Sequence, residues 1–287
     1  MEKSVWNLEQ LLRWLSQESG VQPCVLGFSK IFREGDLAVP YQFGIHSMPF
    51  CNEAKKTARG LLRCLACKER ANRRSVYQQK PFCGTCANGL FEIVRPVVVN
   101  GRCLCIIYLG NLLTDRKRAE RKVHTGCRLT GVNEEKMLRL LSGIREISDP
   151  EPYWQMAELI ESYIRLSLPA VLPEEEEDPM HWVVHRLKNY ADRYPEQNLT
   201  LQQIAKACYF NEKYAGRLFC KQTGMTFHEY LNDVRLKKAE KLLRETDRKV
   251  LQIAMDSGFG QVSYFNRVFA QKHGESPSAW RKREEKS

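Results

Sequence analysis

Hydrophobic positions along the first part of the chain follow both strand-like and helical spacing. In GLFEIVRPVVVNGRCLCIIYLGNLL (residues 89–113), two apolar and β-branched runs flank Asn100-Gly101, a dipeptide that favours the left-handed φ values of a type I′ hairpin turn. Helical patterns lie on either side, around Leu8–Ser16, Glu53–Gln79 and Asn133–Ile144. The pattern therefore predicts an α+β first domain.

A further helical pattern follows in residues 151–171. Its apolar positions recur at helical intervals and comprise Trp154, Ala157, Ile160, Tyr163 or Ile164, and Leu168. This helix either transmits signals or dimerises, since a linker follows it, or it closes the core of the first domain. The pattern leaves both alternatives open.

The sequence LPEEEEDP (residues 172–179) marks the clearest division of the chain. Two prolines bracket five consecutive acids, a composition that neither packs into a core nor continues a helix. We therefore expect a first domain over residues 1–172, an acidic linker over 173–179 and a second domain over 180–287.

Length and composition agree with two globular domains. The chain has 287 residues, of which 43% are hydrophobic and 10% aromatic. The first residues lack the pattern of a signal peptide, and no run approaches the roughly 20 apolar residues of a membrane span. We expect a cytoplasmic protein without a membrane partner, in which the 11 cysteines stay reduced rather than form a disulfide framework.

The net charge of +11 suggests an anionic partner. Residues 180–287 hold 20 Lys and Arg against 12 Asp and Glu, a balance of +8, whereas the first 179 residues hold 25 against 22. The second domain therefore carries more positive charge per residue.

Residues 180–287 contain two copies of one supersecondary unit. The residues Ile204, Ala205, Phe210, Arg217, Phe219 and Gly224 recur as Ile253, Ala254, Phe259, Arg267, Phe269 and Gly274, with one residue inserted in the turn. Capping residues punctuate the copies as helix, turn and helix, and these are Thr200 with Gln203, Asn211, Thr226 with Glu229, and Ser276-Pro277. The repeat predicts an all-α domain of two helix–turn–helix motifs.

One face of the second helix in each motif is free of core positions. These outward residues are Lys213, Gly216, Arg217 and Lys221 in the first copy and Val262, Ser263, Asn266 and Arg267 in the second. Such a helix enters the major groove, where Arg bonds bidentately to guanine and Asn to adenine. Two in tandem predict a protein that reads double-stranded DNA.

Residues 180–284 closely resemble the DNA-binding domain of the AraC/XylS family. The resemblance rests on the segments LQQIAKACYFNEKYAGRLFCKQTGMTFHEYLNDVRLKKAEKLL and IAMDSGFGQVSYFNRVFAQKHGESPSAWR. It implies recognition helices at Glu212–Gln222 and Val262–Lys272, and it also implies transcriptional activation, contact with RNA polymerase and a homodimer. Gly216 departs from the family, in which many members carry a longer polar residue at this position.

Four cysteines have the spacing of a metal site. Cys64-x-x-Cys67 and Cys83-x-x-Cys86, separated by fifteen residues, fit the four-thiolate zinc pattern, with Cys51 as a fifth candidate. An iron–sulfur cluster is the alternative metal group. The non-metal interpretation is reduced, partly buried thiols, and we expect core positions for Cys103, Cys105, Cys208 and Cys220. Basic residues around the pairs fit the solvent face of a helix, with Leu65, Ala66 and Val76 turned inward.

The surroundings of these cysteines resemble the PocR-type sensory domain. FCNE (50–53), Cys64, CANGLFEIVRPVVVNG (86–101) and YLGNLL (108–113) carry the resemblance, which spans about Leu8 to Ile147. It implies a PAS-like antiparallel sheet with helices that senses small organic molecules such as short diols. Ala87 stands where family members usually have His, and Cys67 and Cys83 are additions to the common pattern.

These patterns together predict a transcription regulator controlled by a small organic effector or by a cysteine-bound metal. No nucleophile, acid or phosphate loop stands at a spacing that argues for an enzyme. Two alternatives use the cysteines differently. An Ada-like repair protein would transfer an alkyl group to one thiolate, and a redox switch would oxidise Cys64/Cys67 or Cys83/Cys86.

Overall fold

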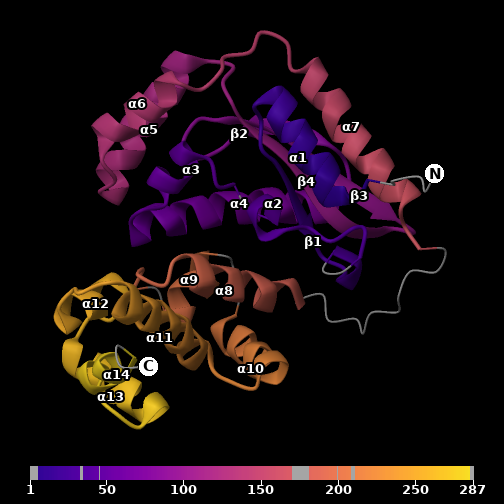
Figure 1. Cartoon of the computed structure of the whole chain (residues 1–287). Helices are drawn as coiled ribbons and strands as arrows, with labels where there is room; N and C mark the ends of the chain where they lie inside the picture. Colours follow the sequence, from indigo (N-terminus) through magenta and orange to yellow (C-terminus); the bar gives the residue numbers. More distant parts are fainter. Residues whose placement is uncertain are drawn as a thin grey trace, which may run out of the picture. The chain divides into compact units, whose positions relative to one another are not determined.

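The chain divides into two compact units, Met1–Pro179 and Met180–Ser287 (Figure 1). The computed structural model describes residues 6–32, 35–44, 46–169, 181–198, 200–207 and 211–284. The predicted acidic linker, Cys208 and Phe210 lie outside these residues. Each unit is described by itself.

The first unit is built on a four-stranded antiparallel sheet in the order β1-β4-β3-β2. The strands are β1 (Pro23–Gly27), β2 (Phe82–Thr85), β3 (Phe91–Val99) and β4 (Arg102–Leu112). Asn100 and Gly101 both have positive φ, 51° and 74°, at the tip of the β3–β4 hairpin. The predicted hairpin and the α+β class are therefore confirmed, while β1 and β2 are too short to stand out in the sequence.

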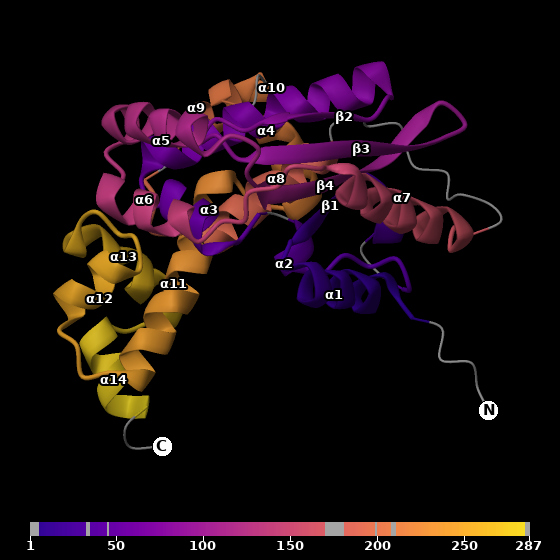
Figure 2. The same ribbon diagram turned by 90° about the horizontal axis from the view of Figure 1, so that it is seen from above.

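Helices cover both faces of this sheet (Figure 2). The elements are α1 (Leu8–Ser19), the 3-10 turn η1 (Lys30–Phe32), α2 (Tyr41–Gly44), α3 (Pro49–Ala54), α4 (Ala58–Gln78), α5 (Arg116–Thr130), α6 (Glu134–Ser142) and α7 (Glu151–Leu166). Helices α1 and α7 pack on one face in the main core, and α4 covers the other, where Cys24, Val94, Ile106 and Tyr108 are buried. A third apolar cluster joins α3, α5 and α6.

Helix α7 closes the main core, which was one of its two predicted roles. Its inward residues are Tyr153, Ala157, Ile160 and Ile164, while Trp154, Tyr163 and Leu168 pack partly buried against the same core. The guanidinium of Arg165 donates to the carbonyl of Val98 (2.9 Å) and pairs with Glu161 (2.7 Å). These polar contacts fix the helix to β3.

The predicted helix over Glu53–Gln79 is two helices. The chain leaves α3 at Lys55 and restarts at α4, because the side chain of Thr57 accepts the backbone N–H of Gly60 (3.1 Å) as an N-cap. Leu65 is buried as expected, but Ala66 is only half-buried and Val76 is 46% exposed. The inward placement of Val76 was wrong because the buried side of α4 runs through Glu69, Asn72 and Ser75, and Val76 and Tyr77 (93% exposed) lie off that side.

The second unit is helical throughout its described residues. Its helices are α8 (His181–Arg193), α9 (Leu201–Ala207), α10 (Glu212–Thr223), α11 (Phe227–Glu245), α12 (Val250–Asp256), α13 (Val262–His273) and α14 (Pro277–Glu284). Gly224 and Gly274 end α10 and α13 with φ of 74° and 75°, and Thr226 with Glu229 forms the expected capping box. The two predicted helix–turn–helix motifs are confirmed.

A buried arginine joins the two motifs. Arg235 of α11 is 6% exposed and donates from Nε to the carbonyl of Pro195 (2.7 Å) and from a terminal nitrogen to the carbonyl of Gln197 (3.3 Å). Gly258, in the turn of the second motif, has φ of +95° and lies so close to this loop that an added Cβ would stand 2.3 Å from the carbonyl oxygen of Pro195. The loop before the first motif is thus packed against the second.

One detail of the predicted cores differs. Cys105 is buried and Cys103 half-buried, as a strand in the sheet requires, but Cys220 is exposed because it falls on the outer side of α10. None of the described helices combines the length and apolar character needed to cross a membrane.

Candidate functional site

Helices α10 and α13 begin at the predicted residues and end one residue later than predicted. Each presents one buried side, with Ala215, Leu218 and Phe219 in α10 and Phe265 and Phe269 in α13. The pattern of exposure is the same in both copies from the last turn of each helix onward, over residues 221–229 and 271–279. The repeat in the sequence is therefore a repeat in three dimensions.

Most of the predicted base-reading side chains are exposed. Those exposed are Lys213, Arg217, Lys221, Ser263, Asn266 and Arg267, whereas Val262 is half-buried. The guanidinium of Arg267 lies 5.2 Å from the ring centre of Tyr264, and the side chain of Arg217 makes no hydrogen bond or ion pair within the described part of the chain. Both helices thus offer an arginine at the equivalent position. Which bases they contact stays a prediction.

Gly216 has a second use that its position on the outer face does not reveal. An added Cβ would lie 3.3 Å from Cδ2 of Leu201 in α9, so the glycine lets the two helices of the first motif approach closely. Contact between Gly216 and DNA stays a prediction.

The first unit holds a buried charged cluster between the sheet and α4. Glu92 of β3, 9% exposed, pairs through Oε1 with Nζ of Lys68 (3.2 Å) and with Nδ1 of His46 (3.0 Å). Nζ of Lys68 also stands 3.4 Å from the ring centre of Tyr108. Gly110 provides space for the side chains of Glu92 and His46, because a Cβ added at this position would lie 3.2 Å from an atom of each.

The charges of this cluster follow from its burial. Burial alone would raise the pKa of Glu92, but Lys68 and His46 outweigh it and lower that pKa to about 2. Burial and the charge of Lys68 lower the pKa of His46 despite its contact with Glu92. At neutral pH Glu92 is therefore an ionised carboxylate and His46 a neutral imidazole.

His46 keeps one unused acceptor. In a neutral ring that faces a carboxylate through Nδ1, the proton resides on Nδ1 and Nε2 carries a lone pair. Nε2 is buried and has no hydrogen-bond partner among the described residues. A buried acceptor without a donor costs free energy, so this position suits a ligand that donates a hydrogen bond.

The same layer continues along α4. Tyr108 donates from its hydroxyl to Oδ1 of Asn72, and Nδ2 of Asn72 lies 3.4 Å from Oε2 of Glu69. Glu69 and Asn72 are 0% and 2% exposed. Polar side chains therefore line the inner side of α4 over about two turns.

The cysteines predicted to bind metal are not brought together as one four-thiolate set. Cys64 and Cys67 lie on α4, Cys86 begins the loop after β2, and Cys51 lies on α3. Cys83 is exposed on β2, opposite Ile93, which faces the main core rather than α4. Among the described residues, no three His, Cys, Asp or Glu side chains form a group that could hold a metal ion.

Four of these thiols nevertheless lie near one another. Cys51 interacts electrostatically with Cys64 and Cys86, and Cys67 with Cys64 and Cys86. Sγ of Cys67 accepts the backbone N–H of Ala87 (3.2 Å). Burial raises the pKa of Cys51 to about 12 and raises those of Cys67 and Cys86, which disfavours the thiolates that alkyl transfer and oxidation require.

Comparisons with known proteins agree with both units. Residues 35–166 match the sensory domain found in PocR, and residues 204–283 match a helix-turn-helix domain. Regulatory protein PocR of Salmonella typhimurium is 23% identical over 258 residues, covering 81% of this chain and 82% of PocR. Regulatory protein SoxS of the same organism is 33% identical over 101 residues, covering 35% of this chain and 94% of SoxS.

A third relative is similar only in part. The uncharacterized HTH-type transcriptional regulator YijO of Escherichia coli is 36% identical over 96 residues, and the chain spans about a third of its length (34%), with 33% of this chain matched.

Two helix–turn–helix motifs with equivalent exposed arginines, joined to a sheet domain with a buried polar interior, define a DNA-binding transcription regulator with a sensor. The chain belongs to the AraC family, and its first unit carries the PocR sensory domain.

The interior charges were missed by sequence reasoning. His46, Lys68 and Glu92 are far apart in sequence, and only the fold brings them together. One signal was present, since Glu92 interrupts an apolar strand. Arg235 was not predicted to be buried either, because a basic residue in a helix rich in charged residues is typical of a solvent-exposed position.

The Glu92–Lys68 pair predicts how the stability of the first unit depends on pH. Because folding lowers the pKa of Glu92 from its usual 4.5 to about 2, its contribution is complete above about pH 4.5 and is lost as the pH falls towards 2. Glu92→Gln leaves Lys68 without its partner, and we expect a loss of about 3 kcal/mol at pH 7 and a smaller loss at pH 3. Urea unfolding at both values measures this.

Glu134→Gln is the matched control, because Glu134 pairs with His124 at the surface, where both side chains are over 40% exposed. We expect it to cost under about 1 kcal/mol. Equal losses for the two variants at pH 7 would contradict the buried-pair account.

Proposed function

We propose that the chain reads a specific DNA site with α10 and α13 and that a small hydroxylated organic molecule, bound in the first unit, controls this activity. The observation that supports DNA reading is the pair of equivalent exposed arginines, Arg217 and Arg267, on a unit of net charge +8. Recognition helices of this kind enter successive major grooves about 34 Å apart.

The effector site we propose is the cluster around His46. Its unpartnered Nε2 accepts a hydrogen bond, and the neutral ring beside an already neutralised Glu92–Lys68 pair has no excess charge to bind an ion. A short, uncharged alcohol or diol matches these requirements, since its hydroxyl donates to Nε2 and its carbons face the apolar residues of the sheet.

Activation of transcription, contact with RNA polymerase and assembly as a homodimer are further proposals that rest on the family resemblance alone. Transcription in vitro from a cognate promoter, with and without the protein, tests the first of them.

The two arginines should carry much of the sequence specificity. Arg217→Ala and Arg267→Ala are each expected to weaken binding to a cognate site by about 1–3 kcal/mol, because each removes a bidentate contact to a base. The site is first selected from random DNA, and affinities are then measured at one fixed salt concentration.

Lys241→Ala is the control for charge, since Lys241 is an exposed residue of α11 away from both recognition helices. It should lower affinity by the same small factor at cognate and random sites. If both arginine variants bind as tightly as the parent, the recognition-helix assignment is wrong.

Binding of the effector should raise the melting temperature of the first unit. A ligand present at 100 times its Kd raises the free energy of unfolding by about 2.7 kcal/mol, which corresponds to a rise of several degrees in melting temperature. We expect this rise with propane-1,2-diol for the parent and for His124→Phe, a surface control, and its loss for His46→Phe. An equal rise in both variants would place the diol elsewhere.

A cysteine-bound metal is a second candidate for control, zinc first and an iron–sulfur cluster as its alternative. Its support is the mutual proximity of Cys51, Cys64, Cys67 and Cys86. Neither the Ada-like alternative nor the redox switch has comparable support, because burial raises the pKa of Cys51, Cys67 and Cys86.

Elemental analysis of protein purified without chelator separates the two kinds of control. One metal per chain that is lost in Cys67→Ser and Cys86→Ser but kept in Cys83→Ser would establish a site of buried thiols. No stoichiometric metal in the parent would contradict this second candidate and leave the organic effector as the proposed control.

A further inference from the structure

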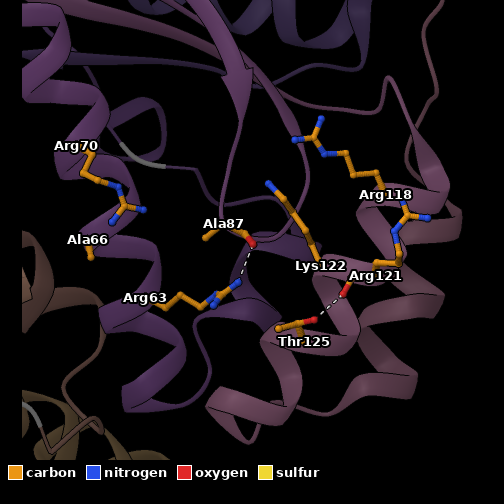
Figure 3. A pocket seen from close by; sticks show the side chains of 8 residues that line it. All are labelled: Arg63, Ala66, Arg70, Ala87, Arg118, Arg121, Lys122 and Thr125. Carbon is orange, nitrogen blue, oxygen red and sulfur yellow. Dashed lines mark hydrogen bonds between the residues drawn. The ribbon is translucent and has the colours of Figure 1, made fainter.

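The first unit contains a cavity of about 670 Å³ whose lining residues do not include His46, Lys68 or Glu92 (Figure 3). It lies between α4, α5 and the loop after β2. The residues that line it are Arg63, Ala66, Arg70, Ala87, Arg118, Arg121, Lys122 and Thr125. Five of these eight are cationic, and none is acidic.

Helical spacing produces this concentration of charge. Arg63, Ala66 and Arg70 follow one another at intervals of three and four on α4, and α5 supplies its own stripe from residue 118 to 125. The two helices pack side by side, so the stripes face a common space. The alanines leave that space open, because neither fills it with a side chain.

Among the described residues, no carboxylate forms an ion pair with the cations of the cavity. The guanidinium groups of Arg70, Arg118 and Arg121 form no ion pair or hydrogen bond within the described residues, and all three residues are exposed. Other arginines of the unit do have carboxylate partners, as Arg95, Arg116 and Arg165 show. Like charges held together in this way favour an anion between them.

Two further cations are held in place by the loop after β2. Arg63 donates from a terminal nitrogen to the carbonyl of Ala87 (2.9 Å), while its Nε is buried without a partner. Lys122 donates from Nζ to Oγ1 of Thr85 (2.9 Å) and lies 3.2 Å from the carbonyl of Cys86. The loop therefore positions both cations, and Nε of Arg63 is a buried donor without a partner among the described residues.

We propose that this cavity is a binding site for a small, multiply charged anion, of the phosphate or polycarboxylate type. Guanidinium groups bind such oxyanions bidentately, and several arginines around one cavity favour two or more anionic groups on the ligand. The site is separate from the recognition helices and binds a ligand of opposite character to the uncharged effector proposed at His46.

Calorimetric titration of the full chain with sodium pyrophosphate tests the site. The double variant Arg118→Gln with Arg121→Gln removes two unpaired cations of the cavity. The control, Lys117→Gln with Arg128→Gln, removes the same charge from exposed positions of the same helix that do not line it. We expect the cavity variant to bind pyrophosphate about tenfold or more weakly and the control to bind as the parent does.

Citrate, titrated in parallel, distinguishes the two kinds of anion, and the tighter binder of the pair identifies the chemistry. All four substituted positions are exposed, so both variants should keep the parent's melting temperature. Equal pyrophosphate affinity in the cavity and control variants, or no binding to the parent, would overturn the proposal.

Binding to a short non-cognate DNA duplex tests whether the cavity contacts DNA instead of a small anion. If the cavity variant loses duplex affinity relative to the control but keeps its affinity for both small anions, the cavity contacts the DNA backbone and the proposed ligand is wrong. Because the recognition helices are unchanged in every variant, this outcome is distinct from a failure of the DNA-reading assignment.

Discussion

The carboxylate of Glu92, buried beneath α4, determines which charges and hydrogen bonds the interior of the sensory unit contains. Burial alone would raise the pKa of Glu92, and Lys68 from the covering helix and His46 from the segment before α3 lower it instead. The ion pair thereby fixes the side of α4 that faces the sheet. It also determines the tautomer of His46 and hence the kind of hydrogen bond that the interior still lacks.

The two polar regions of this unit differ in what they leave unsatisfied. Around Glu92 the charges are balanced and one hydrogen-bond acceptor, Nε2 of His46, is unused. A ligand there would be selected by its hydrogen bonding and its shape. Between α4 and α5 the charges are unbalanced and exposed, so the region discriminates by charge. The loop from Cys86 to Leu90 borders both, because Ala87 donates to Cys67 on one side and accepts from Arg63 on the other. Gly89, with φ of +92° and an added Cβ only 2.6 Å from Cα of Ala119, pins that loop to α5.

Local signals in the sequence were sufficient for the helix–turn–helix repeat and the hairpin. Caps such as Asn211 and Thr226 and the Asn100-Gly101 turn act over three or four residues, so their effect is visible without the fold. The charged interior was not predictable in this way, since its members are over 20 residues apart. The arrangement of the cysteines was not predictable for a related reason, and metal binding stays a prediction. A four-thiolate pattern presumes that both pairs lie on turns, but Cys64 and Cys67 lie within a helix and Cys83 within a strand, which face different partners.

The packing around Arg235 has a consequence for the DNA that this protein can read. Helix α11 has 19 residues and a length of about 28 Å. The loop from Pro195 to Gln197 is held between α11 and the second motif. This packing fixes both the spacing and the relative rotation of α10 and α13. The DNA segments that the two helices contact must therefore have the right rotational position around the duplex as well as the right spacing. If α10 and α13 both enter major grooves, about five base pairs added between the two segments would turn one of them to the opposite face of the duplex. Helix α11 contains no Gly or Pro at which it would kink to follow this rotation.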